Sequence, residues 1–285
     1  MLYLLLAAAA SAALTLVLKW FRDPQGNPYG LLLGNYLTCA LIAFIQMSDR
    51  ARFFDISAST LLLGCIGGVL FVAGLVLMQR SIRESGATLT SAFSKLGMLV
   101  PLFVSLLFFG ESPSWLQAAG ILLAIAAILV LNRNGAAQPG KTGSRPALLL
   151  LLLTLLVCGS SEGMMKVFEQ LGNPAEDTRY FFILFLTAAL LTAFLAIIEK
   201  RKSGKALRPA ELFMGILAGI PNYFSSYFLL KALLFLPAML VYPAFSVGTI
   251  LLVMGVSALF FRERLDKRQG AGLLLILAAL VLLNL

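Results

Sequence analysis

The sequence predicts an all-α membrane protein with ten transmembrane helices, arranged as two inverted-topology repeats of five helices each. Three observations lead to this fold class: an apolar composition, a series of apolar runs of membrane-spanning length, and a stretch that occurs twice. Of the 285 residues, 60% are hydrophobic and 12% are charged, and the mean hydropathy is +0.94. A soluble domain of this length needs far more charge to cover its surface.

The apolar runs have about 20 residues each, which is enough to cross a hydrocarbon core of roughly 30 Å. Lys19 and Trp20 follow the first run, and no basic segment precedes it, so we do not expect a cleavable signal peptide. In chain order the ten runs are 2–18, 29–47, 59–79, 87–109, 115–132, 146–167, 179–198, 210–230, 235–260 and 268–284.

Several classes of enzyme are excluded by the residues present. The chain has no His, which rules out His-based triads and His metal sites. Cys39, Cys65 and Cys158 lie singly inside apolar runs and are interpreted as buried, inert thiols. No loop is long enough to hold an ATPase domain, so energy for any work must come from a gradient. We therefore expect no enzyme activity, no metal and no cofactor.

The C-terminal stretch repeats one that ends the first half of the chain. Residues 105–132 placed over 257–284 give 14 identities in 28 positions without a gap. The triplet GNP at 26–28 recurs at 172–174. The informative pairs are Ser105/Ser257, Phe108/Phe260, Phe109/Phe261, Glu111/Glu263, Gln117/Gln269, Gly120/Gly272, Asn132/Asn284 and, upstream, Lys19/Lys166. The chain is thus divided into a first repeat (1–132), a linker (133–145) and a second repeat (146–285).

An odd number of spans per repeat fixes the geometry. After five spans the second repeat enters the membrane from the opposite side, so a pseudo-two-fold axis in the membrane plane relates the two halves. This is an architecture of secondary transporters, which bind substrate near mid-depth between the repeats.

The same residues resemble the drug/metabolite transporter (DMT) superfamily, in its ten-helix EamA-type branch. The marks are an apolar helix ending in aromatic-aromatic-x-Glu (108–111 and 260–263), then a helix with an early glycine (Gly120, Gly272). The resemblance covers essentially the whole chain and implies the DMT/EamA fold. It does not select a substrate, because the superfamily carries amino acids, sugars, nucleotide sugars, cations and drugs.

Each half also resembles a small multidrug resistance subunit, most clearly in residues 156–174 and 242–266. That family has a carboxylate two helical turns before the Lys that ends its first helix, where this chain has Ser11 and Cys158. Its proton/drug exchange mechanism therefore cannot simply be transferred. The positions that line its binding chamber match Ser94, Tyr242 and Ser246, which the resemblance implies as substrate-binding residues.

Polar residues inside two matching spans form the first set of candidates. Thr15 follows Ser11 by four residues, which places both on one helix face with Lys19. Glu162 stands where the other repeat has Thr15, and an ionised carboxylate in hydrocarbon costs at least about 2.5–3.5 kcal/mol. A substrate-binding or coupling role is expected for Glu162. The alternative is a structural ion pair with Lys166, four residues later, a Lys that could also snorkel to the interface.

Lys95 is the deepest charge, roughly 12 Å from the start of its span at 1.5 Å per residue. Ser91 and Ser94 lie beside it, and Gly97 and Pro101 follow, which can open or kink the helix. Substrate binding or coupling is expected, and a permanent buried ion pair is the alternative. We further predict that Lys95 and Glu162 face one central cavity.

A second polar group and two helix-end acids complete the candidates. The polar-aromatic group of the eighth span, which either lines the cavity or packs helices, is Asn222, Tyr223, Ser226 and Tyr227. Glu111 and Glu263 lie at helix ends and are expected to be structural ties of the following turns.

Charge in the loops predicts orientation. The odd-numbered loops carry 16 Lys and Arg residues and the even-numbered loops carry 4. The positive-inside rule places the odd loops in the cytoplasm and both termini outside. Ten-helix relatives such as nucleotide-sugar carriers, which are usually drawn with both termini inside, imply the reverse.

The sequence therefore predicts a multi-pass protein of the cell inner (plasma) membrane that exports a small polar metabolite by alternating access. One buried cation and one buried acid favour an amino acid or related zwitterion. The alternatives are a proton-coupled antiporter of organic cations or drugs, a lipid-linked sugar flippase, and a non-transporting membrane scaffold. Expected partners are the small-molecule substrate, protons and the lipid bilayer, without nucleic acid, in a monomer or homodimer.

Overall fold

The computed structural model describes residues 1–20, 26–47, 55–85, 87–132, 145–260 and 267–283, and these residues form eleven α-helices and one short 3-10 helix. In chain order the elements are α1 (Leu2–Trp20), α2 (Gly30–Gln46), α3 (Ala58–Ser85), α4 (Ala87–Leu96), α5 (Leu99–Phe108), α6 (Trp115–Asn132), α7 (Arg145–Leu171), η2 (Pro174–Glu176), α8 (Asp177–Ser203), α9 (Pro209–Leu233), α10 (Ala238–Phe260) and α11 (Lys267–Leu283). The predicted all-helical fold is confirmed. Each predicted span falls on one helix, except the fourth, which α4 and α5 share.

The break between α4 and α5 follows from Gly97 and Pro101. In a continuous helix the carbonyl of Gly97 would accept the backbone N–H of residue 101, but proline has no N–H to give. The Gly97 carbonyl instead accepts from the N–H of Val100 at 2.9 Å. The N–H of Met98 bonds to the carbonyl of Lys95 at 3.3 Å, which tightens the last turn of α4. The span therefore divides at mid-depth, as the sequence predicts.

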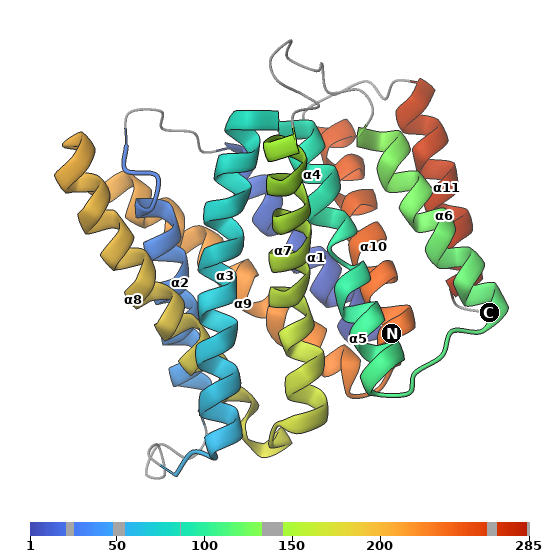
Figure 1. Cartoon of the computed structure of the whole chain (residues 1–285), viewed down its shortest axis with the longest axis horizontal. Helices are drawn as coiled ribbons and strands as arrows, with labels where there is room; N and C mark the ends of the chain where they lie inside the picture. Colours follow the sequence, from blue (N-terminus) through green and yellow to red (C-terminus); the bar gives the residue numbers. More distant parts are fainter. Residues whose placement is uncertain (21–25, 48–54, 86, 133–144, 261–266, 284–285) are drawn as a thin grey trace.

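The helix packing has the exchange symmetry of two repeats. The packing of α1 against α9 has its counterpart in α7 against α3, and that of α2 against α9 in α8 against α3. Likewise α1 packs on α10 as α7 packs on α4 and α5. Helices α2 and α8, and α6 and α11, pack each against its own counterpart. In Figure 1, α2 begins at the top while α8 begins at the bottom, so the two halves run in opposite directions.

Two ends of the bundle are distinguished below. The odd-loop end is where α1, α3, α6, α8 and α10 finish, at the top of Figure 1. The even-loop end is where α2, α5, α7, α9 and α11 finish, and both termini lie towards it. The last turn of α8, at the odd-loop end, carries Lys200, Arg201 and Lys202.

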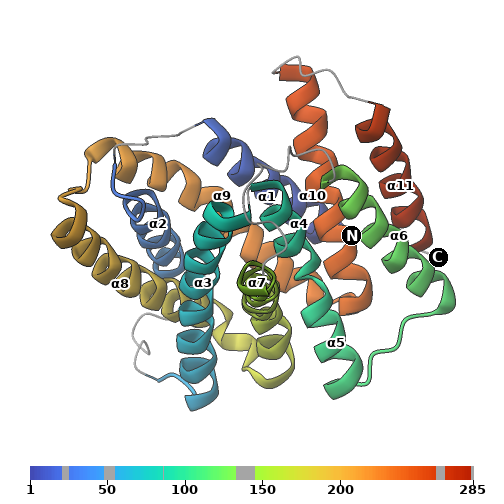
Figure 2. The same cartoon turned by 45° about the horizontal axis from the view of Figure 1, so that its top comes forward.

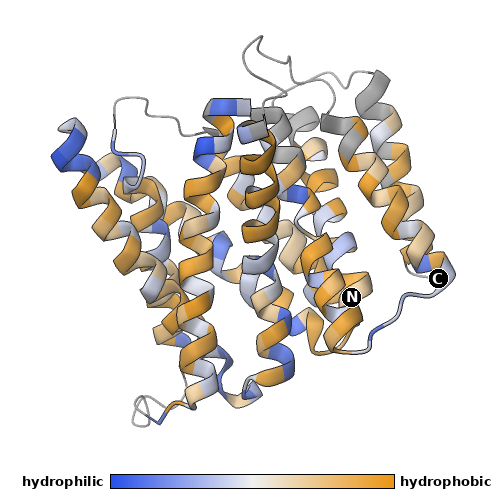
Figure 3. Ribbon diagram, viewed as in Figure 1, coloured by the Kyte–Doolittle hydropathy of each residue, from blue (hydrophilic) through white to orange (hydrophobic). Residues whose placement is uncertain are grey.

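The outward faces of the helices suit a membrane. Five helices are long and apolar enough to span a bilayer, and four shorter apolar helices or helix pairs of 10–17 residues accompany them among the described residues. Large apolar side chains such as Leu190 and Phe194 are more than 60% exposed. Figure 3 shows hydrophobic residues along the middle of the bundle and hydrophilic ones gathered mostly near helix ends. In water such apolar surface is costly, whereas lipid covers it without loss.

Glycines let α2 and α9 approach closely, and this contact positions part of the site. A Cβ on Gly34 would lie 2.5 Å from the backbone oxygen of Leu212, and one on Gly219 would lie 2.7 Å from that of Asn35. Such distances leave no room for a side chain. Small residues at these positions are therefore needed for the two backbones to pack, as is common between membrane helices.

Candidate functional site

A cavity of about 250 Å³ lies between the two halves of the molecule. Side chains of both repeats line it, from α1 to α4 on one side and from α7, α9 and α10 on the other. The lining residues are Ser11, Leu14, Leu18, Leu32, Asn35, Tyr36, Phe71, Gly74, Leu75, Met78, Ser94, Lys95, Cys158, Ser161, Glu162, Met165, Asn222, Ser225, Ser226, Leu229 and Phe245. The wall is mostly apolar, with a few convergent polar groups, as in small-molecule sites.

Lys95 and Glu162 both line this cavity, one from each repeat. They are brought together where Gly97 packs on Gly159: a Cβ on Gly97 would lie 3.0 Å from the backbone nitrogen of Gly159. Lys95 occupies the last turn of α4, where the negative end of the helix dipole stabilises a cation. Within the described residues no direct ion pair joins Lys95 to Glu162. Their shared cavity is as predicted, and their roles remain predictions.

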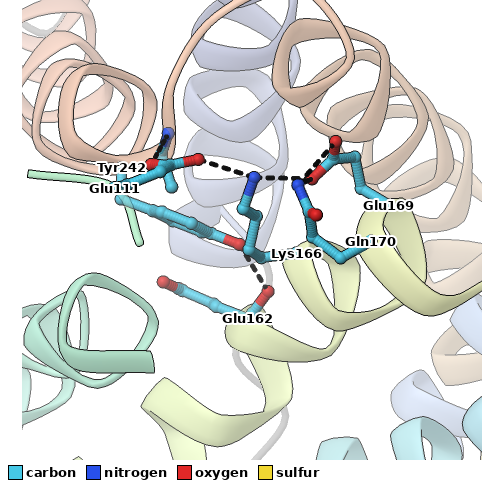
Figure 4. Close-up of polar contacts among 7 residues, drawn as sticks. Glu111, Glu162, Lys166, Glu169, Gln170 and Tyr242 are labelled. Atoms are coloured by element: carbon cyan, nitrogen blue, oxygen red, sulfur yellow. Dashed lines mark hydrogen bonds and ion pairs between the residues drawn. The ribbon is translucent and has the colours of Figure 1, made fainter. Parts of the chain in front are cut away.

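Lys166 belongs to a separate cluster at the even-loop end of α7 (Figure 4). It is 2% exposed, and its Nζ lies 2.7 Å from Oε1 of Glu111 and 2.6 Å from Oε2 of Glu169. The alternative in which Lys166 pairs with Glu162 is therefore wrong. Two other carboxylates form ion pairs with the Lys166 ammonium, and one of them, that of Glu111, comes from the other repeat. Gln170 supports Glu169 by donating to its Oε2 at 2.9 Å.

Glu111 joins three elements at this end of the bundle. One carboxylate oxygen pairs with Lys166 of α7, and the other accepts the backbone N–H of Ala238, the first residue of α10, at 2.8 Å. Tyr242, one turn further along α10, donates its hydroxyl to the backbone oxygen of Glu162 at 3.1 Å. These contacts agree with the expected tying role of Glu111. Its repeat counterpart, Glu263, lies outside the described residues.

The cavity thus has two unlike ends. Towards the odd-loop end it reaches Leu18, Leu32 and Met78, which lie in the terminal turns of α1 and α2 and the C-terminal third of α3. Towards the even-loop end, the Lys166 cluster lies one helical turn beyond Glu162 and joins the two repeats. In this structure an ion-pair cluster therefore holds the even-loop end of the cavity together.

The other predicted site residues divide into two groups. Ser11, Ser94, Asn222 and Ser226 line the cavity. The side chain of Ser91 lies outside the described part of the structure. Thr15, Tyr223, Tyr227, Tyr242 and Ser246 are not among the residues that line the cavity in this structure. For Tyr223 and Tyr227 this agrees with the helix-packing alternative.

Each of these five residues lies elsewhere in the structure. Thr15 is exposed and donates to the Ser11 carbonyl at 2.9 Å, within its own helix. Tyr223 is buried, and its hydroxyl donates to Oε1 of Gln46 at 2.8 Å. Tyr227 stacks on Tyr223 with ring centroids 6.0 Å apart. Tyr242 is fully buried against α7, and Ser246, one turn beyond it, is also buried.

Sequence reasoning missed several polar lining residues. Asn35, Tyr36, Ser161 and Ser225 all line the cavity. Asn35 carried a usable signal, because it is an amide inside an otherwise apolar run. Cys158, interpreted from sequence as buried, is half-buried and lines the cavity.

The fold and the site define a class: a polytopic helical membrane protein whose two inverted halves enclose a central cavity with one cation and one acid. The model of the EamA-like transporter family matches residues 1–133 and again 145–285. The chain belongs to the EamA-like transporter family, a family of membrane transporters of the DMT type.

Two further proteins are similar to this chain. A Haemophilus influenzae protein described only as uncharacterized is 24% identical over 97% of this chain and 95% of its own length. A solved crystal structure matches with a TM-score of 0.77 and 15% identity, over 99% of this chain and 94% of that one. The latter likeness is one of fold alone.

Proposed function

We propose that the chain is a secondary active transporter of the cell inner (plasma) membrane that exports a small zwitterion, such as an amino acid. The observation that carries the proposal is the placement of Lys95 and Glu162, one from each repeat, on a single cavity between the halves. The Lys95 ammonium would bind the carboxylate of the substrate. The Glu162 carboxylate would bind the ammonium group.

The size of the cavity favours a small metabolite. Its volume is about 250 Å³. Pockets for drug-sized ligands run from about 300 to 1,000 Å³. A compact zwitterion fits this volume and cancels both charges of the wall when it binds.

Transport would proceed by alternating access between the two ends of the bundle. The Lys166 cluster closes the even-loop end in the described state, while the cavity reaches towards the odd-loop end. The positive-inside rule assigns the basic odd-loop end to the cytoplasm, so the described state would load substrate from inside the cell. Export then requires that α7 separate from Glu111 and from the start of α10.

Glu162 also supports a second candidate, a proton-coupled antiporter of organic cations. A lone acid on a cavity wall can exchange a proton for a cation. Lys95 weighs against this, because a like charge on the same cavity repels a cationic substrate. The two candidates therefore differ in the net charge of the preferred ligand.

The test is counterflow in proteoliposomes containing the purified protein. Vesicles loaded with one unlabelled neutral amino acid at a time should take up the same labelled amino acid, and a Lys95→Met/Glu162→Gln double variant should not. Tetraphenylphosphonium is the matched cationic probe. Uptake of this cation in place of every zwitterion would overturn the proposal in favour of the antiporter.

A further inference from the structure

A pair of hydrogen-bonded amides forms part of the cavity wall on helices other than those that carry the two charges. Asn35 of α2 and Asn222 of α9 both line the cavity, and Nδ2 of Asn222 donates to Oδ1 of Asn35 at 2.7 Å. The thiol of Cys39 lies 3.5 Å from the same Oδ1 atom. Asn35 is 4% exposed, and Asn222 is half-buried.

This amide pair is held firmly. The close glycine packing of α2 on α9 places Asn35 directly beside Gly219, three residues before Asn222. The backbone oxygen of Gly219 lies 3.2 Å from the Sγ atom of Cys39. Because backbone packing and the thiol fix both helices here, the two amides are held in this hydrogen-bonded arrangement before a ligand binds.

The hydrogen bond between the amides leaves one donor and one acceptor unused. Each carboxamide has one acceptor oxygen and two N–H donors. Oδ1 of Asn35 is engaged, whereas no described protein atom bonds to Nδ2 of Asn35 or to Oδ1 of Asn222. Since both residues line the cavity, a donor and an acceptor are available to whatever fills it.

We propose that Asn35 and Asn222 select a substrate whose side chain carries an uncharged carboxamide. This rests on the proposed function, in which Lys95 and Glu162 take the carboxylate and the ammonium group. The amides come from α2 and α9, whereas the two charges come from α4 and α7, and α2 and the start of α9 lie on the side of the bundle away from α4 and α5 (Figures 1 and 2). The third group of the substrate would therefore meet the amides. A carboxamide presents the matching pair: its oxygen accepts from Nδ2 of Asn35, and its N–H donates to Oδ1 of Asn222.

The expected consequence is discrimination among zwitterions of similar size. A site built to hydrogen-bond a substrate group rejects analogues that lack the group, because its own polar atoms are then left unpaired. Asn222 is only half-buried, so water can partly replace the lost bonds. The preference is accordingly expected to be about 10- to 100-fold, below the limit for fully buried sites.

The experiment measures binding of three ligands to the purified full-length protein by calorimetry: L-glutamine, its near-isostere L-methionine, and L-alanine, which has no third group. Glutamine should bind about 10- to 100-fold tighter than methionine, within the range expected above. Asn222→Leu should reduce that preference at least tenfold. Asn222→Ala serves as a second variant if the leucine side chain impairs folding. Tyr223→Phe is the matched control, since it removes a hydrogen bond from the same helix outside the cavity.

The outcomes separate this inference from the proposed function. Equal affinity of the wild type for glutamine and methionine, with alanine bound, would overturn the amide-pair inference and leave the zwitterion proposal standing. Retention of the preference in both Asn222 variants would overturn it as well. Failure of all three zwitterions to bind would overturn both.

Discussion

We predict that Lys166→Met increases the fraction of molecules in which the even-loop end of the cavity is open. Lys166 is 2% exposed and lies within 2.7 Å of oxygens of both Glu111 and Glu169. Removing one partner of a buried ion pair costs about 3–5 kcal/mol, because it leaves an uncompensated buried charge. The two carboxylates keep 18% and 14% of their side-chain exposure, so the lower figure of about 3 kcal/mol applies.

The substitution destabilises the closed state more than the open state. Opening the even-loop end separates α7 from Glu111 and lets water reach both acids, so their charges are no longer buried. A loss of about 3 kcal/mol shifts the ratio of closed to open molecules by about 150-fold. The assay is the reaction of Cys158, which lines the cavity, with a small charged methanethiosulfonate reagent added from each side of oriented membrane vesicles. A Cys65→Ala background leaves only the fully buried Cys39 besides it. Lys166→Met should speed the reaction from the even-loop side at least tenfold.

Lys231→Met is the matched control. It also removes a lysine ion pair near the even-loop end, but Lys231 and its partner Asp177, 2.6 Å away, belong to the same repeat. The control should leave the reaction of Cys158 from the even-loop side unchanged. An unchanged rate in Lys166→Met as well would refute the idea that this cluster holds the cavity closed.

Three further predictions concern coupling, packing and orientation. Glu162→Gln should abolish proton-linked transport in vesicles with an imposed pH gradient while the melting temperature stays near that of the wild type; retained proton dependence would exclude Glu162 as the coupling acid. Gly159→Val should destabilise the protein by about 1–3 kcal/mol, because the larger side chain overpacks against Val100. The effect is measured as a lower melting temperature. Gly163→Ala is the control and should change the melting temperature little, because its Cβ would meet Pro101 at 3.5 Å. A reporter active only in the cytoplasm should be dark when fused after Leu285 and bright in the loop at 204–208, between α8 and α9; the opposite pattern would reverse the orientation and leave the fold unchanged.

The fold could be predicted from the sequence because its signals are local or repeated. Span length depends on the bilayer thickness, and the broken fourth span depends on Gly97 and Pro101 within one turn of each other. The inverted arrangement followed from the count of five spans per repeat. The shared cavity of Lys95 and Glu162 could also be predicted, because a charge inside a membrane span must face a cavity or a partner.

The partners of the polar residues could not be predicted in the same way. The sequence offers Glu162 one turn before Lys166 and Glu169 three residues after it. Lys166 pairs with Glu169 and with Glu111, 55 residues away, and not with Glu162. Only tertiary packing brings the two together. The spacing of four residues placed Thr15 on the same helix face as Ser11. Of these two residues, however, Ser11 lines the cavity and Thr15 is exposed outside it. The Asn35–Asn222 bond spans 187 residues and depends on glycine packing between α2 and α9.

The most direct test of zwitterion recognition by Lys95 and Glu162 is a binding cycle with charge-deleted ligands. Calorimetry would compare a neutral amino acid with its amide, which lacks the carboxylate, and with its 2-hydroxy acid analogue, which lacks the ammonium group. The wild type should prefer the complete zwitterion to both analogues. Lys95→Met should remove only the preference over the amide, and Glu162→Gln only the preference over the hydroxy acid. Equal losses for both analogues in both variants, or no preference in the wild type, would contradict the assignment of one charge to each residue.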